Sequence, residues 1–459
     1  MERIKKLFQA TDMTVGTPWK KIVAFTIPML VGNIAQQLYN TVDSIVVGKY
    51  VGDNALAAVG SAGPIMNLLL VLFIGISMGA SIMVAQYFGA KQREQLSHTI
   101  GNCIFLTAVA SAIIMVLAVL VVHPLLVLLK TPDTIIDWCT SYLMILFLGV
   151  IGVAYYNILS GVLRGLGDSF SALVYLLVST IINIVLDLLF VAKLGMGVSG
   201  VALATVIAQT VSAILCFIRL ARLTDIFDLK LKYMKPHNKY VKNIVRLGLP
   251  SGLTQAIFSL SMIIVQSLTN SFGEMFIAAN VIVMRVDGFA MLPNFSFGTS
   301  MTTYAGQNVG ARAQDRVIKG AKQGTILAVL TTATITALIL IFGKPLMGIF
   351  TETSELVDLS RRMMGILAAG YVAMAVTQSL SGVMRGAGDT MTPMWISLFT
   401  TVVVRVPLAY GIAWFTRSAE FPNGHQECIF ISLLCSWVIG SIVTTIFYLR
   451  GKWKEKALA

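Results

Sequence analysis

Residues 104–122 read IFLTAVASAIIMVLAVLVV, nineteen consecutive positions without one charged side chain. A helix needs about 20 predominantly apolar residues to cross the ~30 Å hydrocarbon core of a bilayer. Two further stretches, 68–84 and 325–342, are also free of charge and of similar length. These runs predict helices that cross a membrane, and their recurrence predicts a chain that crosses it many times.

The composition supports the same conclusion. Of the 459 residues, 56% are hydrophobic and 12% are charged, whereas soluble domains carry about 25% charged residues. The formal net charge of +13 is compatible with nucleic-acid binding, but the basic residues lie in short loops between apolar runs. That distribution is typical of membrane topology, so no nucleic-acid partner is expected.

Neither the cysteines nor the first residues indicate disulfides, a metal site or a signal peptide. No two cysteines form a CxxC pair, and all five lie in or beside apolar segments, which favours small core side chains over disulfides or metal ligands. Residues 1–21 are polar and basic, and the first apolar run is long enough to remain as a span. We therefore expect no cleavable signal peptide.

The apolar runs predict an all-α membrane protein with twelve transmembrane helices. In the first half these are expected at 22–47, 55–86, 95–122, 134–163, 170–193 and 199–221. In the second half they are expected at 244–270, 275–305, 316–343, 355–384, 391–416 and 427–449. Several exceed the minimum length for a span, which indicates tilted helices or helices that extend beyond the hydrocarbon.

The basic residues predict the orientation of these spans. With both termini placed in the cytoplasm, 25 of the 34 Lys and Arg residues fall on the inner side, seven on the outer side and two inside spans. Cytoplasmic loops of membrane proteins carry this excess. The expectation is a multi-pass protein of a bacterial or archaeal inner (cytoplasmic) membrane with both termini cytoplasmic.

An internal repeat relates the two halves at an offset of about 221 residues. LSGVLRGLGD at 159–168 returns as LSGVMRGAGD at 380–389, and QYFGAK at 86–91 returns as QNVGAR at 307–312. Because the offset equals six spans, an even number, the halves have the same direction and are related by a pseudo-two-fold axis along the membrane normal. This arrangement permits rocking-type alternating access between lobes. The expected domains are a lobe at 1–222, a cytoplasmic connector at 223–241 and a lobe at 242–459.

The repeated Arg-Gly-x-Gly-Asp segments are expected to be structural. Each falls in an inner loop, where the glycines permit a tight turn and Asp168 or Asp389 can cap the following helix. A phosphate-binding loop is disfavoured, because no strand precedes the glycines and no Lys-Ser/Thr follows them.

These features together resemble the MATE (multidrug and toxin extrusion) family, within a larger superfamily that includes polysaccharide and lipid flippases. The resemblance covers nearly the whole chain. It rests on the repeat of six spans, on QQLYNTVDSIVVG at 36–48, on the Arg-Gly-x-Gly-Asp loops and on Arg405-Val-Pro-Leu408. It implies a secondary transporter.

The resemblance also implies a cation site. In what looks like the DinF-like branch, an Asp of the first span and an Asn-x-x-x-Asp pair of the fifth form that site. The matching residues here are Asp43, Asn183 and Asp187, with Thr205 as a further ligand. The NorM-like branch carries a Glu in the seventh span, and none occurs between residues 246 and 270. A NorM-type sodium site in the second lobe is therefore not expected.

Charged residues inside the spans are functional candidates, since each costs roughly 2.5–3.5 kcal/mol near the bilayer centre on insertion scales. At 1.5 Å per residue, Asp43 and Asp187 are expected at similar depth in the outer half of the membrane. Two carboxylates that meet in a dry lobe need a partner, which a proton or Na⁺ would supply. The alternative is that Asp43 anchors a helix end and Asp187 is a structural hydrogen-bonding residue.

The second half contains Arg285, Asp287 and Arg405 inside spans. Arg285 and Asp287 are two residues apart and point to different faces of a helix, so they cannot pair well with each other. An inter-helix pair of Asp287 with Arg405 or Arg285 is expected instead. Such a pair could lock the lobe or take part in a substrate or proton relay.

The expected function is secondary active efflux of amphipathic, cationic drugs or metabolites by antiport against H⁺ or Na⁺. The candidate cavity residues are Gln36, Met66, Asn157 and Gln255. A flippase for lipid-linked saccharides is the alternative. An enzyme is not expected, because the histidines lie at span ends or in loops and no nucleophile or metal cluster occurs. No cofactor is expected besides the coupling ion. The expected partners are small-molecule drugs or metabolites and membrane lipids, and the expected state is a monomer.

Overall fold

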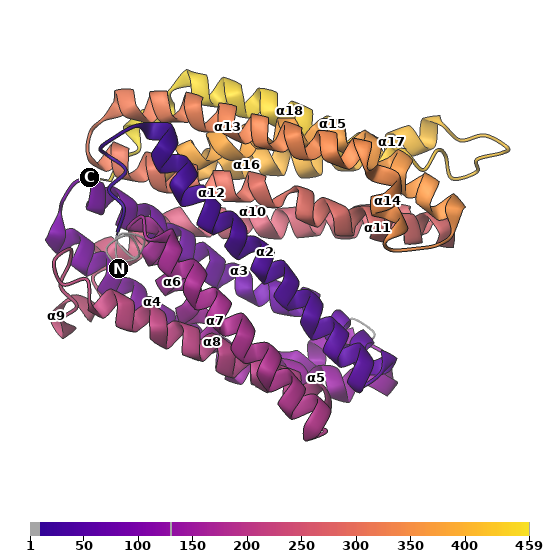
Figure 1. Cartoon of the computed structure of the whole chain (residues 1–459), viewed down its shortest axis with the longest axis horizontal. Coiled ribbons are helices and arrows are strands. Elements are labelled where there is room, and N and C mark those ends of the chain that lie inside the picture. Colours follow the sequence, from indigo (N-terminus) through magenta and orange to yellow (C-terminus); the bar gives the residue numbers. More distant parts are fainter. Residues whose placement is uncertain (1–9, 129–130, 459) are drawn as a thin grey trace. The chain divides into compact units, whose positions relative to one another are not determined.

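The computed structural model describes residues 10–128 and 131–458, and these form helices without any strand (Figure 1). The first half contains α2 (Pro18–Tyr50), α3 (Asp53–Gly89), α4 (Arg93–Leu128), α5 (Asp133–Leu148), α6 (Val150–Gly165), α7 (Ser169–Asp187), the π-helix η1 (Leu188–Lys193) and α8 (Gly197–Ala221). The second half contains α9 (Leu231–Met234), α10 (Asn238–Asn270), α11 (Glu274–Ala290), α12 (Leu292–Gly310), α13 (Gln314–Ile341), α14 (Gly343–Gly348), α15 (Ser354–Gly386), α16 (Met391–Leu398), the π-helix η2 (Phe399–Val404), α17 (Arg405–Phe415), α18 (Cys428–Arg450) and the 3₁₀-helix η3 (Lys452–Glu455).

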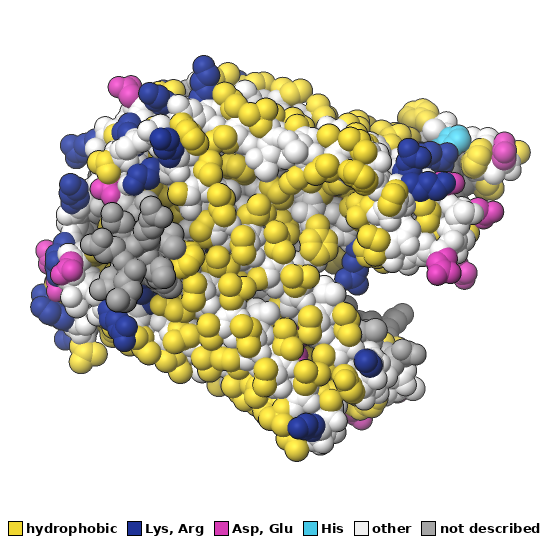
Figure 2. All heavy atoms as spheres, in the orientation of Figure 1, with side chains coloured by type: hydrophobic (Ala, Val, Ile, Leu, Met, Phe, Trp, Pro, Cys, Tyr) yellow, Lys and Arg dark blue, Asp and Glu magenta, His cyan; other side chains and the backbone are white. Residues whose placement is uncertain are grey.

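The described helices fit a membrane-spanning protein. Eleven are long and apolar enough to cross a bilayer, or twelve when α5 and α6 count as one bent span. Large hydrophobic side chains are exposed along many of them, and Figure 2 shows these side chains covering the flanks of the helices while Lys and Arg gather toward helix ends. Extensive exposed apolar surface on helices of spanning length is typical of surfaces that face lipid. The predicted all-α class with many spans is confirmed.

Contacts divide the chain into two compact units. The first contains residues 10–12 and Ile27–Gly252, and the second contains Met13–Thr26 and Leu253–Leu458. In the first unit α8 packs against α5, α6 and α7, and in the second α15 packs against α11, α12, α13 and α18 (Figure 1). This grouping differs from the boundaries expected from the sequence. Residues 13–26 lie with the second unit, and the connector at 223–241 lies with the first.

Hydrogen bonds explain why residues 13–26 belong to the second unit. Met13 is fully buried, and its backbone N–H donates to Gln307 Oε1 over 2.9 Å. The Arg316 guanidinium donates to the backbone oxygens of Met13 and Gly16, each over 3.0 Å. This segment is therefore part of the packed structure of the second unit.

Four expected spans are interrupted, and in the one expected at 170–193 α7 gives way to the π-helix η1 at Leu188. The span expected at 134–163 is two helices, α5 and α6, which meet at a 52° bend beside Gly149. A Cβ at Gly149 would collide with Val206 of α8, so the bend lies where two helices approach unusually closely. The span expected at 275–305 breaks at Met291, ahead of Pro293, and the span expected at 391–416 contains the π-helix η2. Apolar run length does not reveal such interruptions.

The sequence repeat is reproduced in the contacts of the two units. A Cβ at Gly161 or Gly165 of α6 would meet Ser77 or Ser81 of α3. A Cβ at Gly382 or Gly386 of α15 would meet Gly298 or Thr302 of α12. All these positions correspond at the offset of 221 residues, so both units use the same pair of glycines to bring two helices together.

The Arg-Gly-x-Gly-Asp segments have the structural role predicted for them. Gly167 and Gly388 adopt left-handed conformations, with φ of 82° and 98°. Asp168 Oδ1 accepts a hydrogen bond from the Ser171 backbone N–H over 3.0 Å. Asp389 Oδ1 accepts from the Thr392 backbone N–H over 3.2 Å. Each aspartate therefore caps the next helix, and the prediction is confirmed.

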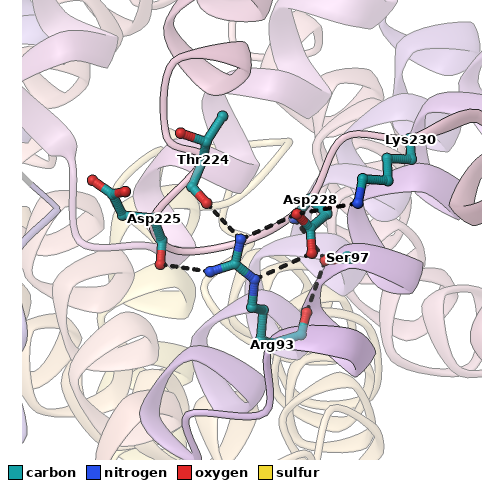
Figure 3. Close-up of polar contacts among 6 residues, drawn as sticks. All are labelled: Arg93, Ser97, Thr224, Asp225, Asp228 and Lys230. Carbon is teal, nitrogen blue, oxygen red and sulfur yellow. Dashed lines mark hydrogen bonds and ion pairs between the residues drawn. The ribbon is translucent and has the colours of Figure 1, made fainter.

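The connector between the repeats is held on the start of α4 (Figure 3). The Arg93 guanidinium donates to the backbone oxygens of Thr224 and Asp225, over 2.6 and 3.0 Å. It also donates to both carboxylate oxygens of Asp228, over 3.1 and 3.2 Å. Further along, the backbone N–H of His237 donates to Asn102 Oδ1 over 2.8 Å. The connector is thus an ordered part of the first unit.

The Arg93–Asp228 contact predicts a pH-dependent loosening of the connector. The hydrogen bond from Arg93 is the main reason that the pKa of Asp228 lies below its ordinary value. A depressed carboxyl pKa contributes stability above the unfolded pKa of about 3.9, and that stability is lost as the pH falls through the folded value. Because the pair is exposed, the effect is local and small.

We expect the Arg93→Gln variant at pH 7 to show faster amide hydrogen exchange in residues 224–230, while exchange in α13 is unchanged. Lowering the pH of the wild type below the folded pKa of Asp228 should produce the same change after correction for intrinsic exchange rates. Lys230→Gln is the matched control. It removes a positive charge 3.9 Å from Asp228 Oδ1 and leaves the contacts of Arg93 with the connector in place, so its exchange should stay close to that of the wild type. Equal exchange in wild type and Arg93→Gln would show that Arg93 does not hold this segment.

Candidate functional site

The four residues expected to form a cation site lie together in the first unit. With the Asn183 amide assigned from its hydrogen-bond partners, its Nδ2 donates to Asp43 Oδ1 over 2.8 Å and to Asp187 Oδ2 over 3.2 Å. The other end of the amide is 3.5 Å from Thr205 Oγ1. One amide nitrogen thus bridges carboxylates from α2 and α7, and we refer to Asp43 and Asp187 as the carboxylate pair.

The local sequence explains this arrangement. Asn183 and Asp187 are one turn apart on α7 and share a face. Both are fully buried, whereas Asp43 is partly buried. The π-helix η1 begins directly after Asp187, and π-turns inside helices frequently accompany functional sites.

Apolar side chains cover one side of the carboxylate pair. A buried cluster of valines and an alanine occupies the adjoining ends of α2, α3, η1 and α8; its members are Val46, Val47, Ala55, Val191, Val198 and Val201. Val46 and Val47 follow Asp43 by one turn, and Val191 follows Asp187 by one turn. Water is therefore largely excluded from one side of the carboxylate pair, so its charge is poorly screened.

The geometry shows why the carboxylate pair needs a cation. Two oxygens that share one nitrogen donor lie no more than about 6 Å apart. At that distance two negative charges repel by roughly 3 kcal/mol at an effective dielectric constant of about 20. Asp187 Oδ1 has no hydrogen-bond partner among the described residues. A proton or a small cation would relieve the repulsion and satisfy this oxygen.

The structure adds Tyr39 to the residues predicted from the sequence. Its hydroxyl donates to Thr205 Oγ1 over 3.2 Å, and its side chain is buried at 5% exposure. Tyr39 lies one helical turn before Asp43, so its position in the 36–48 stretch could have identified it. It links α2 to α8, just as Asn183 links α2 to α7.

The charged residues of the second unit do not form the expected direct ion pair. No salt bridge within 4.0 Å joins Asp287 to Arg285 or Arg405 in the described part of the chain. Asp287 Oδ1 accepts a hydrogen bond from the Tyr371 hydroxyl over 3.0 Å. Arg405 is 2% exposed, and its Nη1 and Nη2 each lie 3.4 Å from Met262 Sδ. Asp287 and Arg405 still interact electrostatically across a larger separation.

The four candidate cavity residues have different surroundings. Asn157 donates to the Val153 backbone oxygen of its own helix over 2.8 Å, which gives its side chain a local structural partner. Gln36 is partly buried and donates to Asn40 Oδ1 over 3.5 Å. Met66 is partly buried in the first unit, while Gln255 is exposed and belongs to the second. Their contact with substrate stays a prediction.

Comparisons with known proteins identify relatives over nearly the full length. The sequence pattern of the MatE family matches residues 28–189 and 250–411, one match in each half. The chain is 30% identical to the "Probable multidrug resistance protein YoeA" of Bacillus subtilis, over 96% of this chain and 95% of the relative. It is 26% identical to the "Probable multidrug resistance protein NorM" of Thermotoga maritima, over 96% and 94%.

Solved structures share the fold. A crystal structure of MATE in complex with MaL6 has a TM-score of 0.90 at 24% identity and covers 96% of this chain and 98% of that chain. An outward-facing multidrug resistance MATE transporter of the MOP superfamily has a TM-score of 0.89 at 24% identity, with coverages of 96% and 97%. Because the family pattern matches both halves and a relative with 30% identity aligns end to end, the chain belongs to the MatE family of multidrug transporters.

Proposed function

We propose that this transporter exports amphipathic, cationic drugs or metabolites by antiport against H⁺ or Na⁺ at the carboxylate pair. The observation that carries the proposal is the single Asn183 amide between Asp43 and Asp187 in a part of the first unit that apolar side chains cover on one side. Two acids held this closely have lower free energy with a cation between them. Binding of the coupling ion can therefore change the affinity for a cationic substrate, and binding of the substrate changes the affinity for the ion by the same factor.

The Asn183 amide provides the link between ion binding and packing. With both carboxylates ionised, Nδ2 faces them as a donor. A protonated carboxyl becomes a donor, and Na⁺ needs oxygen ligands, so either ion favours the amide oxygen at that position. Rotation of the Asn183 amide by half a turn exchanges its oxygen and nitrogen and so changes its contact with Thr205. The Thr205 hydroxyl accepts a hydrogen bond from Tyr39, so the change reaches α2. Binding of a proton or Na⁺ at the carboxylate pair thereby alters how α2, α7 and α8 pack together.

Alternating access then follows from the two-unit architecture, in which rearrangement of one unit opens and closes a substrate path. The proposed orientation keeps both termini in the cytoplasm of a bacterial or archaeal inner membrane, as the distribution of Lys and Arg favours. The proposed working form is a monomer in the lipid bilayer.

In the second unit we assign Asp287 and Arg405 a supporting role. Arg405 is buried with Met262 Sδ as a weak acceptor, and its Nε has no partner among the described residues. Asp287 is bound to Tyr371 instead. A buried guanidinium without a strong acceptor is costly. The proposal is that Asp287 exchanges Tyr371 for Arg405 in another state of the cycle and so forms the expected ion pair there.

The proposed coupling is tested in proteoliposomes loaded with rhodamine 123, a fluorescent cation. One experiment imposes a proton gradient without Na⁺, and the other imposes a Na⁺ gradient at equal pH on both sides. Counter-movement of the dye is expected with one of the two gradients and identifies the coupling ion. Protein-free liposomes give the leak rate. Dye movement at the leak rate under both gradients would contradict the proposal.

A further inference from the structure

A cavity in the second unit is not used by the proposed transport mechanism. It has a volume of about 450 Å³ and lies between the end of α13, the start of α14 and the first turns of α15. Leu340, Gly343, Asp358, Arg361 and Arg362 are among its lining residues. Its size is within the range of 300–1,000 Å³ that is usual for small-molecule sites.

The cavity contains one arginine without a partner. Arg362 Nη2 pairs with Glu427 Oε1 over 2.8 Å, and Lys344 Nζ pairs with Asp358 Oδ1 over 3.4 Å. Arg361, by contrast, makes no hydrogen bond or ion pair with any residue that the structure describes. The surplus charge at this cavity is therefore positive, and it belongs to a guanidinium with all of its donors available.

Gly343 gives the Arg361 side chain its position. A Cβ at residue 343 would lie 3.5 Å from Arg361 Cγ, so the stem of the arginine packs over the glycine backbone. That contact holds the stem at the cavity wall. A planar guanidinium held in this way favours a ligand with two oxygens on one centre, such as a phosphate.

An apolar surface adjoins the cavity. Leu340, which lines it, is 49% exposed, and the next two residues, Ile341 and Phe342, are 71% and 56% exposed. Leu340 and Ile341 are the last residues of α13, a candidate membrane span, and Phe342 follows it. Polar groups therefore lie beside a lipid-facing surface. Figure 2 shows the corresponding gathering of basic and acidic side chains at the end of this unit where α14 and α17 lie in Figure 1.

We propose that this cavity binds the headgroup of an anionic phospholipid, with the phosphate on Arg361 and an acyl chain along Leu340 and Ile341. The positive-inside rule disfavours Lys and Arg in outer loops. Under the orientation proposed above, three of the seven outer basic residues, Lys344, Arg361 and Arg362, nevertheless gather here. Because Lys344 and Arg362 are already paired with Asp358 and Glu427, the positive charge left for an anionic lipid is that of Arg361, and only the choice of leaflet depends on the proposed orientation.

The test is lipid binding by the purified full-length protein in a zwitterionic detergent. The probes are dihexanoyl phosphatidylglycerol, dihexanoyl phosphatidylcholine, glycerophosphoglycerol (the same anionic headgroup without acyl chains) and inorganic phosphate. Affinity is measured by native mass spectrometry and, independently, by the rise in Tm that a ligand of the folded state produces. Neither readout requires transport, so a negative result is distinguishable from a failure of the proposed antiport.

The wild type is expected to bind dihexanoyl phosphatidylglycerol at least tenfold more tightly than the other three probes. Arg361→Gln should weaken this binding roughly tenfold or more, because a charged hydrogen-bond donor is lost. Arg361→Lys should retain part of it. Arg417→Gln is the matched control, since Arg417 is another exposed arginine of the same unit outside the lining of the cavity.

Three results would overturn the proposal. Equal binding by wild type and folded Arg361→Gln removes Arg361 from the site. Equal losses in Arg361→Gln and Arg417→Gln indicate general surface charge. Tight binding of inorganic phosphate or glycerophosphoglycerol, in competition with the lipid, indicates a site for free anions and excludes the acyl-chain contact. Size-exclusion profiles of the variants show whether each is folded.

Discussion

The Asp187→Asn variant is expected to lose ion-coupled drug exchange while it still folds. Asp187 is fully buried, and the substitution keeps its shape while removing its negative charge. Asp43 would then no longer face a second carboxylate across Asn183, so the repulsion that favours cation binding disappears. In the proteoliposome assay, gradient-driven rhodamine 123 movement should fall to the leak rate of protein-free liposomes.

The matched control is Asp137→Asn, which removes one exposed carboxylate of the same unit. This control should exchange the dye like the wild type. Asp43→Asn should resemble Asp187→Asn, because either substitution leaves a single acid beside the Asn183 amide. Tm values within a few degrees of wild type would show that folding is intact. Full exchange by folded Asp187→Asn would refute the assignment of the carboxylate pair.

The Gly382→Ala variant is expected to be strongly destabilised, because there is no space for a side chain at this position. A Cβ there would collide with the backbone oxygen of Gly298 on α12 and lie 3.0 Å from Met301 Cβ. Rigid backbone cannot move aside as a flexible side chain can. Overpacking costs typically 1–3 kcal/mol and more where backbone must shift, so the Tm in detergent should fall by several degrees or the protein should fail to fold.

Gly365→Ala tests whether this cost is specific to the close contact. Gly365 lies in the same helix α15, and nothing lies within 4 Å of a Cβ built there. Because alanine has the higher helix propensity, by about 1 kcal/mol, this substitution should leave the Tm unchanged or raise it. If Gly382→Ala and Gly365→Ala had the same Tm, close approach of α12 and α15 would not explain the repeated glycine pair.

The sequence identified the two acids and the amide of the candidate cation site by separate signals, whereas Thr205 came from the family resemblance and Tyr39 from the structure. Asp43 and Asp187 stand out as charges inside apolar runs, and Asn183 is one turn from Asp187. Counting residues along each span places the two acids at one depth. No sequence signal revealed Tyr371, the partner of Asp287, because a tyrosine in an apolar span is indistinguishable from core until its hydroxyl is located.

The sequence by itself determined the membrane-spanning class, the twofold repeat and the helix caps after each Arg-Gly-x-Gly-Asp segment, since hydrophobicity, periodicity and capping are properties of neighbouring residues. Only the tertiary structure decided the bend at Gly149, the packing of Met13–Thr26 with the second unit and the separation of Asp287 from Arg405. These features depend on contacts between residues distant in the chain. Steric fit and hydrogen-bond competition at such contacts depend on three-dimensional positions, which local patterns do not specify.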